Sequence, residues 1–269
     1  MATPAAQVRT EEVLFDIRDH IATITINRPE VQNTISGPML NAVTQRLIEA
    51  NENSDVRAVI LTGSGRFFCA GLDLRGSGIS SGLSAGSGPA NLDLRNTPPT
   101  VLHAVDKPTI CALNGSAAGY GMDLALGCDI RIMADNAKMA AAFTARGVLP
   151  ESGGTWILPR LLGWSKAAEI IFSGRTLTAA ESLELGLVSR VVPADDVAGA
   201  ARELATAIAA NAPLAVQAAK RMMRIGMNET FDDHVHHVFL QLLPLFRSDD
   251  FKEGMASFLE KRKPEFKGR

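Results

Sequence analysis

The chain has 269 residues, and its 27 Lys and Arg residues nearly balance its 29 Asp and Glu residues, which leaves a formal net charge of −2. This balance excludes a polycationic nucleic-acid coat and a polyanionic disordered tail, and the single tyrosine and two tryptophans argue against a platform for stacking bases. Hydrophobic residues make up 46% and charged residues 21%, as in a soluble globular protein of one large α/β domain, with or without an appendage.

The first fifty residues predict two strands followed by a helix. Apolar residues alternate with other residues over 13–17 and again over 23–26, which is the period of a strand with one buried face. The short polar segment 18–20 between them predicts a hairpin turn. Ser36 followed by Pro38 and then by apolar residues at helical spacing predicts an N-cap and the first turn of a helix.

Three apolar segments then predict buried parallel strands: residues 56–62 (VRAVILT), 108–113 (PTICAL) and 129–134 (DIRIMA). The apolar segment 119–127, between the last two, predicts a buried helix. Strands that alternate with helices favour parallel pairing through right-handed crossovers.

Residues 76–88 contain five glycines and five serines in 13 positions, a composition that cannot bury enough surface to become ordered. We therefore expect a flexible loop here. Two interpretations stay open: a tolerated surface insertion, or a mobile lid over a substrate site.

Beyond residue 155 the pattern becomes helical. Thr178 and Glu181 form a capping box, Gly186 is placed to end that helix, and residues 188–192 predict one more short strand. Asn211 with Pro213 predicts the start of another helix, and two more helices are predicted over 229–247 and over 249–263. We therefore expect an α/β core over residues 1–193 and a C-terminal helical region over residues 194–269.

The three cysteines, Cys69, Cys111 and Cys128, form no CxxC pair, and this odd, sparse number favours a reducing compartment over a disulfide scaffold. No apolar run is long enough to cross a membrane, and residues 1–10 lack the apolar stretch of a secretory signal. We therefore expect a cytoplasmic protein with no membrane partner and no nucleic-acid partner.

Several motifs that carry known chemistry are incomplete. Gly63 and Gly65 follow a strand, but Phe68 stands where a dinucleotide-binding loop needs its third glycine, and neither a P-loop nor a GxSxG nucleophile motif occurs. The only histidine cluster is 233–237 (DHVHH), in which His234 and His237 would share a helix face. No acidic partner completes a zinc-like spacing, so we interpret it as a solvated or partner-facing surface, with metal binding as the minor alternative.

Two segments remain, residues 67–75 and 114–124. Each presents backbone N–H groups at the end of a predicted strand, and the second also begins a helix, so the two together could form an oxyanion hole. Small residues such as Gly115 can alternatively serve only to pack a helix close to a sheet. That alternative explains the bulky Tyr120 and the acidic Asp123 in an apolar helix less well.

With these residues the chain resembles the enoyl-CoA hydratase/isomerase (crotonase) family almost from end to end. The resemblance implies a crotonase-like spiral of ββα units with a C-terminal helical trimerisation region, assembled as a homotrimer or a dimer of trimers. The matching segments, in order, are Ile26–Pro29, Phe68–Leu74, Asn114–Leu124, Cys128–Arg131, Gly147–Pro159, Leu177–Val192 and Phe258–Lys263.

The resemblance implies an acyl-CoA substrate and no separate cofactor, because coenzyme A is part of the substrate. The backbone N–H groups of Leu72 and Tyr120 match the pair that binds the thioester oxygen and stabilises an enolate. Tyr120 replaces the glycine common there, which keeps the N–H but narrows or lines the pocket. The positions that match substrate- and CoA-binding residues are Ala70, Leu72, Asp73, Leu74, Arg75, Tyr120, Phe258 and Lys261.

Two carboxylates match catalytic positions of the family. Asp123 matches the first acid of the hydratases, and Glu151 matches the acid with which isomerases move protons along the acyl chain; its alternative role is to cap the helix near Thr155. Phe143 stands where hydratases carry their second glutamate, and a phenyl ring cannot activate water. The resemblance therefore favours double-bond migration over hydration.

Three other functions stay open. A hydratase could use Asp123 with Glu151. The chain could also be a non-catalytic or weakly active acyl-CoA-binding homologue, a hypothesis motivated by Phe143 and Tyr120. A ClpP-like serine protease would share the spiral, but no Ser/His/Asp set supports it.

Overall fold

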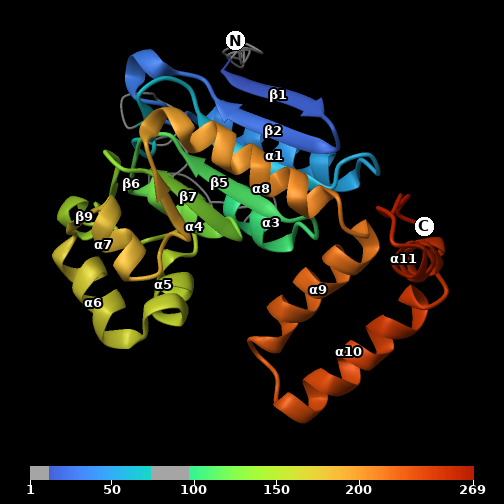
Figure 1. Cartoon of the computed structure of the whole chain (residues 1–269). Helices are drawn as coiled ribbons and strands as arrows, with labels where there is room; N and C mark the ends of the chain where they lie inside the picture. Colours follow the sequence, from blue (N-terminus) through green and yellow to red (C-terminus); the bar gives the residue numbers. More distant parts are fainter. Residues whose placement is uncertain (1–11, 74–96) are drawn as a thin grey trace, which may run out of the picture.

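A six-stranded sheet forms the centre of the protein, whose computed structural model describes residues 12–73 and 97–269 (Figure 1). Its strands lie in the order β1-β2-β3-β5-β7-β10; the first two pair antiparallel and the others pair parallel. The predicted strands and their parallel pairing are thus confirmed. The strands are β1 (Val13–Arg18), β2 (Ile21–Ile26), β3 (Ala58–Gly63), β5 (Thr109–Leu113), β7 (Ile130–Ala134) and β10 (Arg190–Val192).

The predicted hairpin turn joins β1 to β2. Asp19 and His20 both have positive φ angles, 50° and 65°, as in a two-residue turn whose twist matches that of the strands. Every residue of β5 is buried, because helices cover both faces of the sheet.

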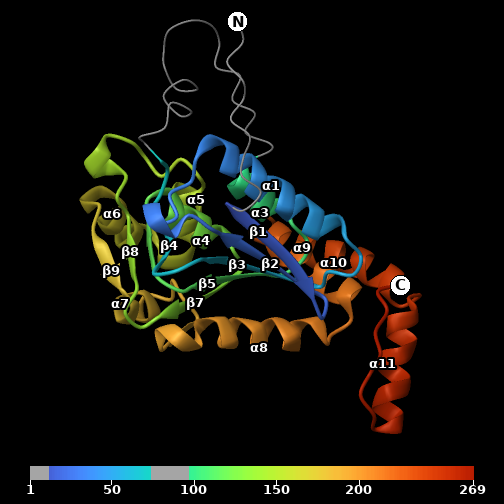
Figure 2. The same ribbon diagram turned by 90° about the horizontal axis from the view of Figure 1, so that it is seen from above.

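Figure 2 shows the helices on the two faces of this sheet. On one face lie α1 (Gly37–Glu52), α3 (Pro98–Ala104) and α4 (Tyr120–Gly127), while α8 (Val197–Ala209) crosses the other face and contacts β3, β5 and β7. Ser36 caps α1 as predicted, accepting a hydrogen bond from the N–H of Met39 at 3.4 Å. The predicted buried helix is α4, all but its last residue being buried.

A second sheet, in the order β4-β6-β8-β9, lies beside the first. Its strands are β4 (Phe67–Cys69), β6 (Ser116–Ala118), β8 (Lys138–Ala140) and β9 (Thr176–Thr178). We did not predict this sheet, because each strand has three residues and so shows no periodicity in the sequence. β4 lies in the segment 67–75 and β6 in the segment 114–124, the two segments that sequence analysis selected as candidates.

Three short helices follow β8: α5 (Gly154–Leu162), α6 (Trp164–Ser173) and α7 (Ala179–Glu184). The predicted capping box of α7 is present, since the side chains and backbones of Thr178 and Glu181 bind each other reciprocally. Gly186, with φ of 76°, follows the end of α7 as predicted.

The chain ends in α9 (Pro213–Gly226), α10 (Phe231–Leu245) and α11 (Asp249–Glu260), three helices that extend away from the central sheet (Figure 1). The N-cap of α9 is Ala212, one residue after the predicted Asn211. The division at residue 193 stays a prediction; α8, which follows it, packs on the central sheet.

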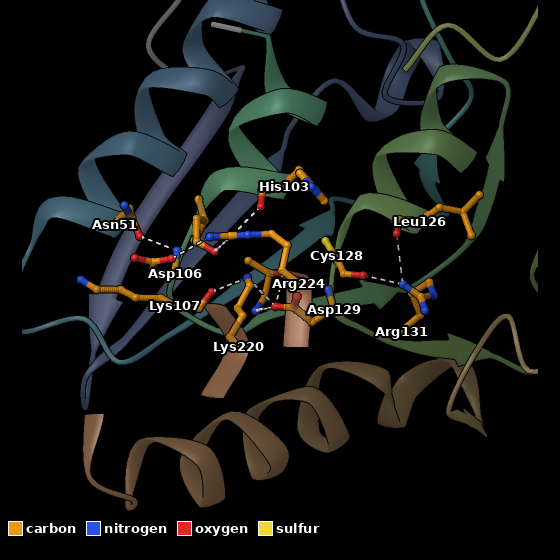
Figure 3. A network of polar contacts seen from close by, with 12 residues as sticks. Asn51, His103, Asp106, Lys107, Leu126, Cys128, Asp129, Arg131, Lys220 and Arg224 are labelled. Atoms are coloured by element: carbon orange, nitrogen blue, oxygen red, sulfur yellow. Dashed lines mark hydrogen bonds and ion pairs between the residues drawn. The ribbon is translucent and has the colours of Figure 1, made fainter. Parts of the chain in front are cut away.

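A polar network joins α9 to the segment between α3 and β5 (Figure 3). Asp106 accepts hydrogen bonds from Arg221 at 2.8 Å and Arg224 at 3.1 Å, and Lys220 forms an ion pair with Asp129 at 2.7 Å. Burial opposes ionisation of Asp106, but the hydrogen bonds and charges of the two arginines hold its pKa below the usual value. The network therefore fastens the C-terminal helices to the body.

We expect Asp106→Asn to lower the free energy of unfolding by about 1–3 kcal/mol at pH 7, because each arginine loses a charged acceptor. A lowered folded-state pKa gives stability that is present above the ordinary Asp pKa of 3.8 and is lost as the pH falls through the folded value. The difference in unfolding free energy between variant and wild type should therefore become smaller below pH 3.8. Urea unfolding at pH 7 and pH 3 measures it.

Asp195→Asn is the control, because Asp195 is exposed and forms no ion pair with any residue in 12–73 or 97–269. Its free energy of unfolding should stay within about 0.5 kcal/mol of wild type. An Asp106→Asn protein as stable as this control at pH 7 would contradict the role of the network.

Candidate active site

A cavity of about 540 Å³ opens where β4 and β6 meet the first turn of α4. Its walls come from four segments, residues 30–34, 70–73, 118–120 and 142–151. Both segments that the sequence singled out therefore contribute to one cavity. Leu72, Tyr120, Phe143 and Glu151 all line it, as do Ala70 and Asp73.

Glycines allow the two central segments to touch backbone to backbone. A Cβ atom on Gly121 would lie 2.1 Å from the carbonyl oxygen of Cys69, and one on Gly115 would lie 2.0 Å from that of Arg66. Gly71 has a φ of 111°, and a Cβ atom there would lie 3.9 Å from the amide nitrogen of Tyr120. Close packing therefore explains Gly115, as one interpretation held, and it also brings the 70–73 segment beside the start of α4.

The backbone amides of Leu72 and Tyr120, both on the cavity wall, donate no hydrogen bond to any residue that the structure describes. Their neighbours are paired, since the N–H of Asp73 binds the carbonyl oxygen of Ile35 at 2.9 Å and that of Gly119 binds Ala140 at 3.0 Å. Tyr120 begins α4, where backbone N–H groups have no partner within the helix. Both amides are therefore available to a molecule bound in the cavity.

Asp123 lies behind the cavity wall rather than on it, with none of its surface exposed. Its Oδ2 accepts a hydrogen bond from the N–H of Ser152 at 3.1 Å. Burial is the largest influence on its pKa and, with the negative charge of Glu151, raises it to about 7, although the amides of Ser152 and Gly154 act in the opposite direction. A Cβ atom on Gly154 would lie 2.3 Å from Oδ1, so only glycine fits there.

Glu151 is exposed to solvent and lines the cavity. The alternative that it caps the following helix is wrong: the N-cap of α5 is Gly153, whose φ is 106°, and no side chain caps that helix. Its carboxylate is thus available to a bound molecule.

Two aromatic side chains make the cavity narrower and less polar. Phe143 precedes the 3-10 turn Thr144–Arg146 and is 3% exposed, and Tyr120 is 6% exposed. Burial, together with the nearby Cys69, Glu151 and Asp123, raises the pKa of Tyr120 far above its usual value. The tyrosine is therefore neutral at any physiological pH.

The structure does not bring every predicted binding residue to the cavity. Phe258 is 79% exposed on α11, Lys261 follows it in an exposed position, and neither lines the cavity. Leu74, Arg75 and the Gly/Ser loop 76–88 lie outside the described residues.

Sequence analysis also missed part of the cavity wall, residues 30–34. Asn33 has a positive φ of 57° and is fully buried, and its side-chain amide donates to the carbonyl oxygens of Ser64 and Phe67. Arg28 binds Asp73 at 3.2 Å and so ties this segment to the 70–73 wall. The only signal in the sequence was the matching segment Ile26–Pro29, which precedes it.

Within 12–73 and 97–269, no three His, Cys, Asp or Glu side chains gather as a metal would require. His234 and His237 both face Glu229, at 3.5 and 2.8 Å. Among the same residues, no helix has both the length and the apolar character to cross a bilayer.

Comparison with known proteins gives a consistent result. The family model described as "Enoyl-CoA hydratase/isomerase" matches residues 16–269. The chain is 34% identical to the 1,2-epoxyphenylacetyl-CoA isomerase and 33% identical to the 2,3-dehydroadipyl-CoA hydratase of Escherichia coli, over 96% of this chain and 99% of each relative. A crystal structure of an enoyl-CoA hydratase from Bacillus anthracis superposes with a TM-score of 0.87 at 34% identity, covering 96% of this chain and all of that one. The expected crotonase fold is confirmed.

We expect Asp123→Asn to change how stability depends on pH. An acid whose folded-state pKa is raised, here from 3.8 to about 7, contributes stability that is present at low pH and is lost as the pH rises through the folded value. The variant should therefore gain up to about 4 kcal/mol of unfolding free energy relative to wild type between pH 4 and pH 8. Urea unfolding at both pH values measures this gain, and identical pH dependence in the two proteins would contradict the shift.

Proposed function

The chain belongs to the enoyl-CoA hydratase/isomerase family and is an enzyme that acts on acyl-CoA thioesters, and from this premise we propose that it moves a carbon–carbon double bond along the acyl chain. The observation that carries this proposal is that Glu151 and Phe143 both line the cavity. The cavity offers a carboxylate where an isomerase uses one and a phenyl ring where a hydratase activates water.

In this proposal the amides of Leu72 and Tyr120 bind the thioester oxygen. Removing a proton from the acyl chain places negative charge on that oxygen, and two prearranged donors stabilise it most when the charge is greatest. A donor of this kind typically contributes about 3–4 kcal/mol to the barrier. The side chain of Tyr120 does not alter its own backbone donor, so the substitution of tyrosine for glycine preserves this part of the chemistry.

Glu151 accepts the proton from one carbon of the acyl chain, and the electrons of the broken C–H bond pass into the enolate. Glu151 then returns the proton to another carbon of the acyl chain, where electrons of the enolate form the new C–H bond; the double bond shifts and the thioester is restored. Asp123 is the second carboxyl group of the site. Because its pKa is about 7, it can release or take up a proton near neutral pH and so serve as a second acid–base group.

Hydration needs a second group that activates water, and Phe143 has no atom that accepts a proton. The relatives do not decide between the reactions, because a named isomerase and a named hydratase are about equally similar to the chain. The preference for isomerisation therefore rests on the cavity.

The direct test supplies the purified protein with 2-enoyl-, 3-enoyl- and dienoyl-CoA thioesters and identifies the products by mass spectrometry and NMR. We expect migration of the double bond without incorporation of ¹⁸O from labelled water. Hydration of 2-enoyl-CoA at an ordinary enzyme rate would overturn the proposed reaction, and CoA binding without any turnover would favour the non-catalytic homologue.

In the same assay, Glu151→Gln and Asp123→Asn should each lower kcat by about 10²–10⁴-fold, the contribution of general acid–base catalysis. Both variants keep the size of the side chain, and circular dichroism can verify their folding. A Glu151→Gln enzyme with wild-type kcat would remove Glu151 from the reaction.

We further propose that the chain assembles as a homotrimer or a dimer of trimers through its C-terminal helices. None of the residues of α10 is buried, yet the helix carries many large apolar side chains. Phe258 and Leu259 on α11 are 79% and 75% exposed. Packing against another copy would cover these side chains and could bring Phe258 and Lys261 to the CoA portion of a substrate bound by the neighbour.

Sedimentation equilibrium should therefore give three or six times the chain mass of 28.6 kDa. Replacing the exposed Phe239 of α10 with Glu should shift the protein towards smaller species, whereas Lys166→Glu on α6 should not. A wild-type protein that sediments as a single chain would contradict the assembly.

A further inference from the structure

The first turn of α4 contains two polar atoms that are buried and have no hydrogen-bond partner within the described chain. One is the hydroxyl oxygen of Tyr120, and the other is Oδ1 of Asp123. Buried polar groups are paired in the great majority of protein structures, because an unpaired one forfeits its hydrogen bonds to water. Both atoms lie in one turn of a helix that begins at the cavity, which suggests that they act together.

The two side chains are close enough for the charge of Asp123 to influence Tyr120. Tyr120 and Asp123 are three residues apart on α4 and therefore lie on the same helix face. Tyr120 is 6% exposed and Asp123 is not exposed at all, so water does not compete for either group. A hydroxyl is a donor and an ionised carboxylate is an acceptor, which makes the pair complementary once Asp123 has lost its proton.

The backbone of Gly154 lies against the free oxygen, since a Cβ atom there would be 2.3 Å from Oδ1; its amide lowers the pKa of Asp123 but forms no hydrogen bond with Oδ1. The groups that influence Tyr120 electrostatically are Cys69 of β4, Glu151 of the segment before α5, and Asp123 itself. Of these, Glu151 carries a negative charge and so repels an ionised Asp123. The amide of Ser152 already binds the other oxygen, Oδ2.

We propose that the Tyr120 hydroxyl is a positioning group for Asp123, donating a hydrogen bond to Oδ1 when the carboxyl group is ionised. Tyr120 keeps its own proton throughout, and Asp123 gives its proton up and regains it. With the Ser152 amide on Oδ2, both oxygens of the carboxylate then have a donor. The contribution of this bond to turnover rests on the proposed function, but the bond itself does not.

The single tyrosine gives a selective probe. Protein grown with 3-fluorotyrosine carries one ¹⁹F label, at position 120. Its ¹⁹F chemical shift should change with pH in a step centred near 7, the pKa of Asp123, in the absence of substrate. The step should vanish in Asp123→Asn and move to lower pH in Glu151→Gln, because the charge of Glu151 raises that pKa. A flat shift in the wild type, or the same step in Asp123→Asn, would overturn the proposal.

Tyr120→Phe tests the consequence for the reaction, since it removes only the hydroxyl and keeps the ring and the backbone N–H. A hydrogen bond to a charged group affects an equilibrium by about 10–100-fold, so kcat should fall by about that factor with KM unchanged. The limb of the pH profile near 7 should move to higher pH, because the ionised form of Asp123 loses a donor. A purely structural role would lower the Tm and leave this limb in place, and such a result would overturn the proposal.

Thr44→Val is the matched control. The hydroxyl of Thr44 is also buried and unpaired within the described chain, but it lies on α1 and does not line the cavity. This variant should keep the kcat and the pH profile of the wild type. A wild-type protein that shows the ¹⁹F step but turns over no enoyl-CoA would overturn the proposed function and leave the hydrogen bond standing.

Discussion

The site depends on a direct contact between two stretches of backbone. The chain leaving β4 and the chain entering α4 approach so closely that a side chain on Gly115 or Gly121 would overlap a carbonyl oxygen. Leu72 and Tyr120 each lie within three residues of the contact between Cys69 and Gly121, and both line one cavity. The central sheet fixes where both stretches begin, since β3 leads into the first and β5 into the second, and these two strands pair in parallel.

The sequence predicted those elements that are long enough to show a periodic pattern or that begin with a recognisable cap. The strands of the central sheet are long enough to show periodicity or a continuous apolar run, and Ser36 and Thr178 cap helices in the way their type and spacing indicate. The three-residue strands of the second sheet carry no such signal, so their pairing emerges only from the three-dimensional contacts. The small residues of segment 114–124, Gly115 and Gly121 among them, did indicate a close approach of the backbone there.

The chemistry of the acids was less accessible from sequence. The resemblance to the family singled out Asp123 and Glu151 as candidates, yet it did not reveal that Asp123 is fully buried behind the cavity wall while Glu151 faces solvent. That difference arises where the loop after β8 enters α5: the backbone of Ser152 and Gly154 covers Asp123, while the side chain of Glu151, just before them, faces solvent. The wall formed by 30–34 escaped prediction because its conformation depends on Asn33, whose side-chain amide donates to two carbonyl oxygens more than thirty residues away.

The two unpaired amides belong to the main chain, and this has a consequence for how such a protein can change. Mutation replaces side chains but leaves the peptide N–H in place at every residue except proline. Positions 72 and 120 can therefore accept large differences in bulk, as the tyrosine at 120 illustrates, while the donors persist. In the proposed reaction the path of the backbone therefore fixes the two donors, and a substitution at either position changes the cavity around them rather than the donors themselves.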